Sequence, residues 1–221
     1  MTRRKTSTRV DGEITRQRIL DAAGKLFAIN GFAETTSKSI AMEADVDLAS
    51  INYHFGSRNG LYQNVLAAAH SSIINIERLN QITQNEQSAQ EKLRAFIELL
   101  CNATRSGHEW QAQTLAREIL APTSNLAVLF QKELEPKLMI IRELLSEVTG
   151  IPSDAPQLAP CMLNVIAPCM VLLVAGQSVP GAMQETANLP QEQLIEHMYH
   201  FALSGLLAMG EHYRLTHLQQ A

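Results

Sequence analysis

Three helix-length segments with very short breaks between them fill the first sixty residues, and this pattern constrains the fold more than any other feature. The first segment repeats apolar residues at the three- and four-residue spacing of one helix face, at Ile19, Ala23, Leu26 and Phe27. Asn30-Gly31 ends it, because glycine accepts the left-handed conformation that a helix stop requires. We expect two short helices to follow, over 37–44 and 48–54.

Capping residues precede each of the later segments. Thr35-Thr36 offers a hydroxyl to the helix over 37–44, and Asp47 can cap the helix over 48–54. Ser57 can cap a long helix that begins near Arg58. Two short helices held by a longer one form a helix-turn-helix, whose second helix can enter a DNA major groove. A plain helical hairpin with a solvated polar face has the same spacing, so both interpretations stay open.

The outward face of the helix over 48–54 suits contact with bases. It presents small or hydrogen-bonding side chains and no carboxylate, at Leu48, Ala49, Ser50, Asn52 and Tyr53. Asparagine pairs well with adenine, serine can serve either base type, and Ala or Leu can touch a thymine methyl group. The face is therefore chemically compatible with sequence-specific reading of DNA.

Positive charge is concentrated at the N-terminus. Residues 1–60 contain nine Lys and Arg against seven Asp and Glu, whereas the whole chain has a formal net charge of −4. The first ten residues carry Arg3, Arg4, Lys5 and Arg9. A basic N-terminal segment in an otherwise acidic chain favours contact with a polyanion such as nucleic acid. A solvated N-terminal tail explains the same charges.

The rest of the chain is also predicted to be helical, and the fold class we expect is all-α. Strand alternation and hairpin turns are nearly absent from the sequence. Glycine and proline delimit further expected helices over 88–106, 109–120, 124–149, 158–177 and 190–215. Pro136 falls inside one of them and can kink or split it. The three cysteines are too few for a disulfide scaffold and favour a reducing, cytoplasmic setting.

The segment from Leu158 to Gly176 is apolar apart from Asn164 and approaches the length of a membrane span. Pro160 and Pro168 interrupt it and charged flanks are missing, so a buried core helix is the better interpretation. Its apolar residues surround the helix, which predicts burial on several sides.

The last expected helix, over 190–215, carries an apolar stripe interleaved with small residues. The stripe consists of Leu194, Met198, Phe201, Ala202, Gly205 and Met209. Together with the helix over 158–177, it can pair with a second copy of the chain as a four-helix bundle. Both helices can instead close the core of one chain, and that alternative stays open.

Residues 13–62 resemble the DNA-binding domain of the TetR/AcrR family of bacterial transcriptional regulators. The resemblance rests on Arg18-Ile19-Leu20-Asp21-Ala22-Ala23, Leu26-Phe27, Asn30-Gly31-Phe32, Thr35-Thr36, Ile40-Ala41, Ala44-Asp45-Val46 and the run from Ile51 to Leu61, in this order. It implies an N-terminal three-helix helix-turn-helix domain over 13–62, joined by a continuous helix to a larger helical ligand-binding and dimerisation domain over 63–221. A flexible basic tail over 1–12 is expected to precede them.

The resemblance also implies roles for single residues. Phosphate contacts fall on Thr36, Tyr53, His54 and Arg58, and base contacts on Lys38, Leu48, Ala49, Ser50 and Asn52. Three positions depart from the usual family pattern, so the operator sequence cannot be taken from relatives. Asn52 stands where a Tyr is frequent, Leu48 where a more polar residue is usual, and Gly56 where a Lys is common. The basic tail is expected to attract phosphates in general rather than to enter the minor groove.

Regulators that look like this chain bind a double-stranded DNA operator as homodimers and respond to small molecules. We accordingly expect a homodimer through the last two helices, a palindromic operator, and a repressor that a small, largely apolar effector releases. Candidate effector-binding residues are Trp110, Arg117, Met139, Met162, Met170 and Tyr199. Each can equally be a core residue, and Arg117 with Glu118 can form a surface ion pair or orient a polar ligand.

Other sites have little support in the sequence. His197 and His200 are three apart on one helix, but no third metal ligand is evident. Cys161 and Cys169 lie about 12 Å apart along one helix, too far for a disulfide within it, although a switch between subunits stays open. Catalytic and phosphate-loop motifs are missing, so we expect neither an enzyme nor a cofactor. The alternative is a helical enzyme or adaptor that keeps the pattern without reading DNA.

Overall fold

The computed structural model describes the backbone of residues 4–218 and the side chains of residues 11–216. Every regular element in this range is a helix, so the all-α prediction is confirmed. The chain divides into two compact units. The first comprises Met1–Ser72 and Trp110–Lys132, and the second comprises Ile73–Glu109 and Glu133–Ala221.

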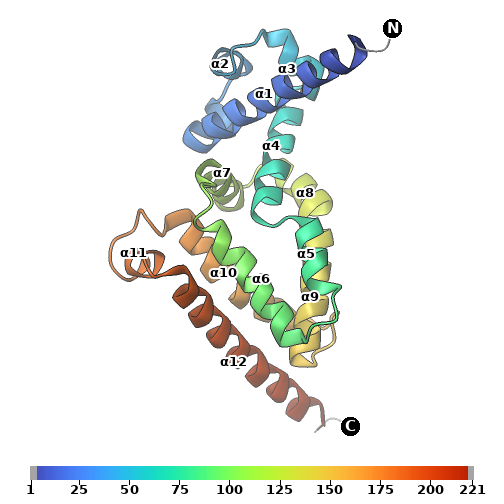
Figure 1. The fold of residues 1–221 in the computed structure, drawn as a ribbon, viewed down its shortest axis with the longest axis vertical. Coiled ribbons are helices and arrows are strands. Elements are labelled where there is room, and N and C mark those ends of the chain that lie inside the picture. The colour runs from blue at the N-terminus through green and yellow to red at the C-terminus, as the bar shows by residue number, and fades with distance from the viewer. Residues whose placement is uncertain (1–3, 219–221) are drawn as a thin grey trace. The chain divides into compact units, whose positions relative to one another are not determined.

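The first unit is built from helices of both its chain segments. They are α1 (Arg4–Glu34), α2 (Ser37–Glu43), α3 (Leu48–Phe55), α4 (Arg58–Ile73), α7 (Glu109–Leu120) and α8 (Asn125–Leu129). In Figure 1, α1, α2 and α3 gather around the first turns of α4. Phe27, Ile40, Ile51, Leu61 and Leu66 are fully buried and form the centre of this core. The three-helix head predicted from the sequence is therefore present.

The start of α1 falls within the segment over 1–12 for which the sequence predicts a flexible tail. Helical backbone begins at Arg4. The side chains of Arg3, Arg4, Lys5 and Arg9 lie outside the described residues. Their expected attraction to phosphates stays a prediction.

Local hydrogen bonds start and stop these helices where the sequence predicts it. Gly31 interrupts α1 with a φ of 78°. The Thr36 hydroxyl accepts the Ser39 N–H at 3.1 Å, and the Ser57 hydroxyl accepts the Gly60 N–H at 3.0 Å. α4 passes residue 62 without a break and ends at Ile73, after which Asn75 caps a separate helix that the sequence did not predict, α5 (Ile76–Thr83).

Helix α7 packs against α1 at a glycine. The Thr114 hydroxyl donates to the Gly24 carbonyl at 3.4 Å. A Cβ atom built on Gly24 would lie 2.4 Å from Cζ3 of Trp110, far inside van der Waals contact. The close approach of the Trp110 ring to α1 therefore depends on the missing side chain at this position.

The contact predicts opposite effects of two glycine substitutions in the same helix. Gly24→Ala should lower the thermal unfolding midpoint, because overpacking against Trp110 costs about 1–3 kcal/mol and outweighs the gain in helix propensity. Gly12→Ala is the matched control, since a Cβ there meets no atom within 4 Å, and it should stabilise by about 0.5–1 kcal/mol. Adding Trp110→Leu to Gly24→Ala should recover part of the loss. Equal stabilisation by both glycine substitutions would contradict the tight contact.

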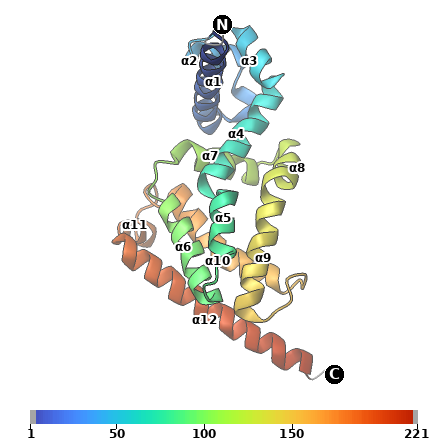
Figure 2. The ribbon, with the colours of Figure 1, turned by 45° about the vertical axis from the view of Figure 1, so that its right-hand side comes forward.

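The second unit packs five helices side by side with one short helix at its edge. It contains α5, α6 (Ala89–Ala103), α9 (Glu135–Thr149), α10 (Leu158–Ala175), α11 (Ala182–Ala187) and α12 (Gln191–Leu218). α12 packs against α6 and α9, and α10 packs against both of these helices (Figure 2). Leu93, Phe96, Leu100, Ile141 and Leu145 are fully buried and lie in the centre of this unit.

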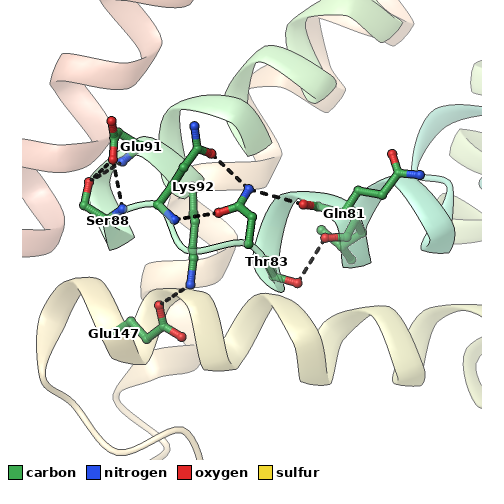
Figure 3. A network of polar contacts seen from close by, with 9 residues as sticks. Gln81, Thr83, Ser88, Glu91, Lys92 and Glu147 are labelled. Atoms are coloured by element: carbon green, nitrogen blue, oxygen red, sulfur yellow. Dashed lines mark hydrogen bonds and ion pairs between the residues drawn. The ribbon is translucent and has the colours of Figure 1, made fainter.

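A polar network fastens the start of α6 (Figure 3). Ser88 and Glu91 form a reciprocal cap, which satisfies backbone N–H groups at the helix N-terminus. One turn further along, the Lys92 ammonium lies 3.2 Å from the Glu147 carboxylate of α9. The Lys92 side chain is mostly buried whereas the Glu147 side chain is half exposed, so this ion pair joins α6 to α9 at the edge of the core.

The helix expected over 124–149 is divided, as Pro136 predicts. α8 ends at Leu129, a π-helical turn, η1, spans Phe130–Leu134, and α9 begins at Glu135 with proline in its first turn. Proline has no N–H to donate and its ring crowds the preceding turn, so the backbone widens there.

Helix α10 is less buried than the sequence predicts. Its residues Leu158, Cys161, Val165, Cys169 and Leu172 face the core of the second unit, whereas Leu163, Val171 and Val174 are exposed. Burial on several sides is therefore wrong for a single chain, because α10 lies on the surface of its unit and only one face meets other helices. Among the described residues, α10 is the one helix long and apolar enough to cross a bilayer.

Candidate nucleic-acid interface

Arg18 of α1 holds the turn between α2 and α3. Its guanidinium donates to the carbonyl oxygens of Ala44 at 2.6 Å and Asp45 at 3.0 Å, and it lies 3.4 Å from the Asp45 carboxylate. Asp45 has a φ of 50°, a left-handed conformation that costs energy for residues other than glycine. The contacts with Arg18 offset that cost and fix the direction in which α3 leaves the turn.

The N-terminus of α3 is closed by its own cap. The Asp47 carboxylate accepts the Ser50 N–H at 2.7 Å and the Ser50 hydroxyl at 2.8 Å. These hydrogen bonds lower the pKa of Asp47, so the carboxylate is ionised where the positive end of the helix dipole stabilises it. Ser50, a predicted base contact, therefore uses its hydroxyl proton inside the cap and keeps oxygen lone pairs for other donors.

The predicted DNA-contacting residues lie on α2, α3 and the start of α4. Tyr53 is 85% exposed and Leu48 is half exposed, so both side chains present most or half of their surface to solvent. Ala49 and Asn52 are exposed on the same helix, and Lys38 is exposed on α2. The structure thus brings together an exposed, carboxylate-free face of α3, as the sequence predicts.

Two further predicted phosphate contacts have partners within the protein. The Thr36 hydroxyl belongs to the cap of α2. His54 is half-buried, and its ring meets that of Tyr53 edge-on at a centroid distance of 5.0 Å. Thr36 lies at the N-terminus of α2, where a phosphate oxygen would also meet backbone N–H groups, whereas His54 lies in the last turn of α3.

Arg58 points into the protein rather than away from it. Its guanidinium donates to the carbonyl oxygens of Phe32 at 3.0 Å and Thr35 at 2.6 Å, and it stacks over the Phe32 ring at 4.3 Å from the centroid. Phe32 lies in the last turn of α1, after Gly31, and Thr35 lies in the connection between α1 and α2. Arg58 therefore orders the helix-turn-helix from the side of α4.

A buried carboxylate joins α7 to α4 within the first unit. Glu118 is 1% exposed and accepts the Tyr62 hydroxyl at 2.8 Å, the Thr123 N–H at 3.0 Å and the Thr123 hydroxyl at 2.8 Å. Burial raises the pKa of Tyr62, and donation to the Glu118 carboxylate raises it further. The Tyr62 ring also packs between Phe27 and Phe32, at centroid distances of 4.7 and 4.6 Å.

Arg117, the neighbour of Glu118, binds the end of α1. It donates to the carbonyl oxygens of Ala28 at 2.7 Å and Ile29 at 2.9 Å, just before the kink of α1 at Gly31. The predicted surface ion pair between Arg117 and Glu118 is wrong, because consecutive helical residues point in different directions and each meets a different helix. Adjacent residues of α7 thus hold α1 and α4.

The six predicted effector-binding residues do not gather in one unit. Trp110 and Arg117 belong to the first unit, where both contact α1. Met139, Met162, Met170 and Tyr199 belong to the second, where Met139 is exposed and the other three are half-buried. Arg94 lies over the Tyr199 ring, 5.6 Å from its centroid.

A surface cleft of about 500 Å³ lies in the second unit, between the end of α9 and the last turns of α12. It is lined by Thr149, Gly150, Leu207, Gly210, Glu211, Tyr213 and Arg214. None of the six predicted effector-binding residues lines it.

The predicted histidine pair makes separate contacts. His200 lies 3.0 Å from the Glu196 carboxylate, while the His197 ring stacks on Phe201. Within residues 11–216, no three His, Cys, Asp or Glu side chains come together as metal ligands.

Sequence reasoning missed the residues that position α3 through contacts with distant parts of the chain. Nothing in the sequence around Arg18 indicates its contact with Asp45, which spans 27 positions. Glu118 was expected at the surface, yet it is buried. An acidic residue inside the apolar stretch from Leu115 to Leu120 is the one local signal for such a role.

Models of two protein families match the chain. The model described as bacterial regulatory proteins, tetR family, matches residues 19–65. The model of the C-terminal domain of the HTH-type transcriptional dual regulator CecR matches residues 89–206, which is more than half of the 221 residues. The two matches agree with a DNA-reading head followed by a helical regulatory part.

Two curated relatives match the chain over part of their length. The probable HTH-type transcriptional regulator YttP of Bacillus subtilis (strain 168) is 29% identical over 83 residues, which cover 38% of this chain and 40% of that protein. The HTH-type transcriptional regulator SrpR of Pseudomonas putida is 38% identical over 61 residues, which cover 28% of this chain and 29% of that protein. The chain therefore matches less than half the length of either relative.

Solved structures share the fold over most of their length. The fatty acid degradation regulator FadR from Bacillus halodurans superposes with a TM-score of 0.66 at 15% identity, covering 87% of this chain and 96% of that one. A TetR-like transcriptional regulator from Rhodococcus sp. RHA1 superposes with a TM-score of 0.63 at 18% identity, covering 87% of this chain and 95% of that one. With the helix-turn-helix geometry and both family models, these likenesses show that the chain belongs to the TetR family of bacterial DNA-binding transcriptional regulators.

Proposed function

We propose that the chain is a cytoplasmic repressor that binds a palindromic operator as a homodimer and is released by a small, largely apolar effector. The observation that carries this proposal is the exposed face of α3, which lacks a carboxylate and whose preceding turn is held by Arg18 of α1. Such a face suits the floor of a major groove, where negative side chains would meet electronegative base edges and phosphates.

The face divides into positioning and reading residues. Tyr53 and His54 are proposed to contact phosphates, together with Thr36 at the start of α2. Lys38, Leu48, Ala49, Ser50 and Asn52 are proposed to meet base edges. Asn52 has the strongest claim to sequence reading, because its exposed amide can pair with adenine in two hydrogen bonds.

The homodimer is proposed to form through α10 and α12. On α12, Phe201 is 76% exposed, and Gly205, Ala208 and Met209 are exposed on the turns that follow. On α10, Leu163 is 64% exposed. A second copy would remove this apolar surface from water and would place two reading heads on one face of the duplex.

The proposed domain roles keep the predicted boundaries. Residues 13–62 read DNA, and residues 63–221 bind effector and dimerise. α7 lies in the second of these ranges but packs with the first unit, which makes it the proposed route between effector and DNA. The effector lowers DNA affinity by the difference between its affinities for the two conformations.

The proposal is tested by selecting bound duplexes from a random pool with the purified protein at physiological salt. We expect enrichment of an inverted repeat whose half-sites are about one helical turn apart. A folded protein that enriches no sequence would contradict the proposal. Weak binding to all duplexes, or turnover of a substrate, would favour the alternative of a helical adaptor or enzyme without sequence-specific DNA binding.

Substitution of neighbouring residues of α3 should separate base reading from phosphate contact. Asn52→Ala should relax the selected consensus at one or two positions per half-site, because a bidentate base contact contributes about 1–3 kcal/mol of discrimination. Tyr53→Phe should weaken binding to all duplexes equally. Selection with each variant measures the difference, and an unchanged consensus for Asn52→Ala would remove Asn52 from the reading set.

A further inference from the structure

Two cysteines that are distant in sequence meet in the core of the second unit. Cys101 lies near the end of α6 and Cys169 in the middle of α10, 68 positions later. Their Sγ atoms are 4.0 Å apart, and each residue is 1% exposed. The sequence left open only a pairing between subunits of Cys161 and Cys169, which share a helix.

The geometry lies within reach of a disulfide. A disulfide has an S–S length of about 2.05 Å, so the two sulfur atoms must approach by about 2 Å. Rotation of the two thiols, together with a small shift of α6 against α10, can supply that approach, because the helices already pack on each other. Both thiols are free in the structure.

The pair is chemically asymmetric. The hydrogen bond with Cys169 lowers the pKa of Cys101, and the positive charge of Arg105 contributes in the same direction. The same hydrogen bond and burial raise the pKa of Cys169. Arg105 is the positive charge that distinguishes the two positions, and it favours a thiolate on Cys101, so Cys101 is assigned as the sulfur that attacks first.

We propose that Cys101 and Cys169 form a dithiol site that reacts with small uncharged peroxides and closes to a reversible disulfide between α6 and α10. The Cys101 thiolate attacks one peroxide oxygen, the O–O bond breaks, and the departing oxygen takes up a proton and leaves as water or alcohol. Cys101 then carries a sulfenic acid. The Cys169 sulfur attacks the Cys101 sulfur, and the sulfenic hydroxyl leaves as water with the Cys169 proton. The peroxide gains two electrons and the two thiols lose them.

Burial selects the oxidant. Hydrogen peroxide is close to water in size and carries no charge, so brief local opening admits it. Glutathione disulfide is a large anion that needs direct access to a sulfur atom for thiol exchange. Peroxide should therefore close the site much faster than glutathione disulfide.

The position of Cys101 connects the site to DNA binding, and this step rests on the proposed function. Residues 104–108 join the end of α6 directly to α7. α7 in turn holds α1 through Arg117 and α4 through Glu118. Closing the disulfide shifts the end of α6 away from its reduced position, so we expect oxidation to lower operator affinity about tenfold, within the usual range of coupling between sites.

The site itself is tested without DNA. The full-length protein is treated with hydrogen peroxide, its remaining thiols are blocked, and peptides are analysed by mass spectrometry before and after reduction with dithiothreitol. We expect a reducible peptide pair linking Cys101 to Cys169 in the wild type and in Cys161→Ala, the matched control. Cys101→Ala and Cys169→Ala should give no such pair. The proposal would be overturned if all three cysteines stayed reduced, or if the disulfide that formed contained Cys161.

The coupling is tested on an operator obtained by selection with the reduced protein. Peroxide should weaken operator binding of the wild type and of Cys161→Ala about tenfold, dithiothreitol should restore it, and Cys101→Ala should not respond. A disulfide that forms while affinity stays within twofold would overturn the coupling alone. Failure of the reduced protein to select any operator would count against the proposed function, while the mass analysis would still decide the dithiol site.

Discussion

Replacing Glu118 by alanine is expected to lower the free energy of unfolding of the first unit by about 3–5 kcal/mol, the typical cost of breaking a buried polar network. The variant leaves the Tyr62 hydroxyl and both donors of Thr123 without their acceptor in a nearly dry site. It also removes the carboxylate that ties α7 to α4. We expect operator binding to weaken in parallel, because α4 follows directly after α3, the helix proposed to contact bases, and carries Arg58.

Three comparisons separate the network from the loss of side-chain volume. Glu118→Gln keeps the shape and one acceptor oxygen and should cost about half as much as alanine. Tyr62→Phe removes one donor, and the double variant Tyr62→Phe/Glu118→Gln should cost less than the sum of the two. Denaturant unfolding measures all of these values. Strictly additive costs would show that the two groups do not interact.

The pH dependence of stability offers an independent check on the same pair. The pKa of Tyr62 is raised in the folded protein above its unfolded value of 10.0, so the neutral phenol is the favoured form. The contribution of the Tyr62–Glu118 hydrogen bond to the free energy of unfolding is therefore fully present below pH 10. It is lost as the pH rises from 10 through the higher pKa of the folded state. The Tyr62→Phe variant should be less stable than the wild type at neutral pH. Its free energy of unfolding should fall less than that of the wild type as the pH rises above 10.

Replacing Arg58 by alanine is expected to destabilise the first unit by about 2 kcal/mol, after allowance for the partial exposure of the guanidinium. It should also weaken binding to every duplex by at least about tenfold, since contacts away from base edges carry little sequence information. The physical reason is the loss of the donors to Phe32 and Thr35, which order the connection between α1 and α2.

Lysine at position 58 distinguishes positioning from direct phosphate contact. An ammonium keeps the charge but cannot reproduce the forked hydrogen bonds or the stacking on Phe32. If Arg58 acts by positioning, Arg58→Lys should lose most of the affinity while the dependence of binding on salt stays the same. A phosphate contact would instead show as nearly full affinity for Arg58→Lys and a salt slope reduced by about one for Arg58→Ala.

Much of the N-terminal fold could be predicted because its signals act over four residues or fewer. The caps at Thr36, Asp47 and Ser57 and the stop at Gly31 depend on backbone groups next to them, so residue type and spacing suffice. The same rule explains the widened turn ahead of Pro136. Asn75 caps α5 by the same kind of local hydrogen bond, although no separate helix was predicted there from the sequence.

The contacts that organise these helices join distant positions, and no local pattern encodes them. Glu118 meets Tyr62 across 56 positions, Arg117 meets Ala28 across 89, and Cys101 meets Cys169 across 68. The direction of each side chain depends on how one helix is rotated against another, which follows from the packing of the whole unit. The sequence by itself thus determined the helices of the N-terminal part, their ends and the exposed face of α3 that is proposed to read DNA. Only the tertiary structure decided which polar groups are buried and which helices they hold, because burial is a property of the packed chain.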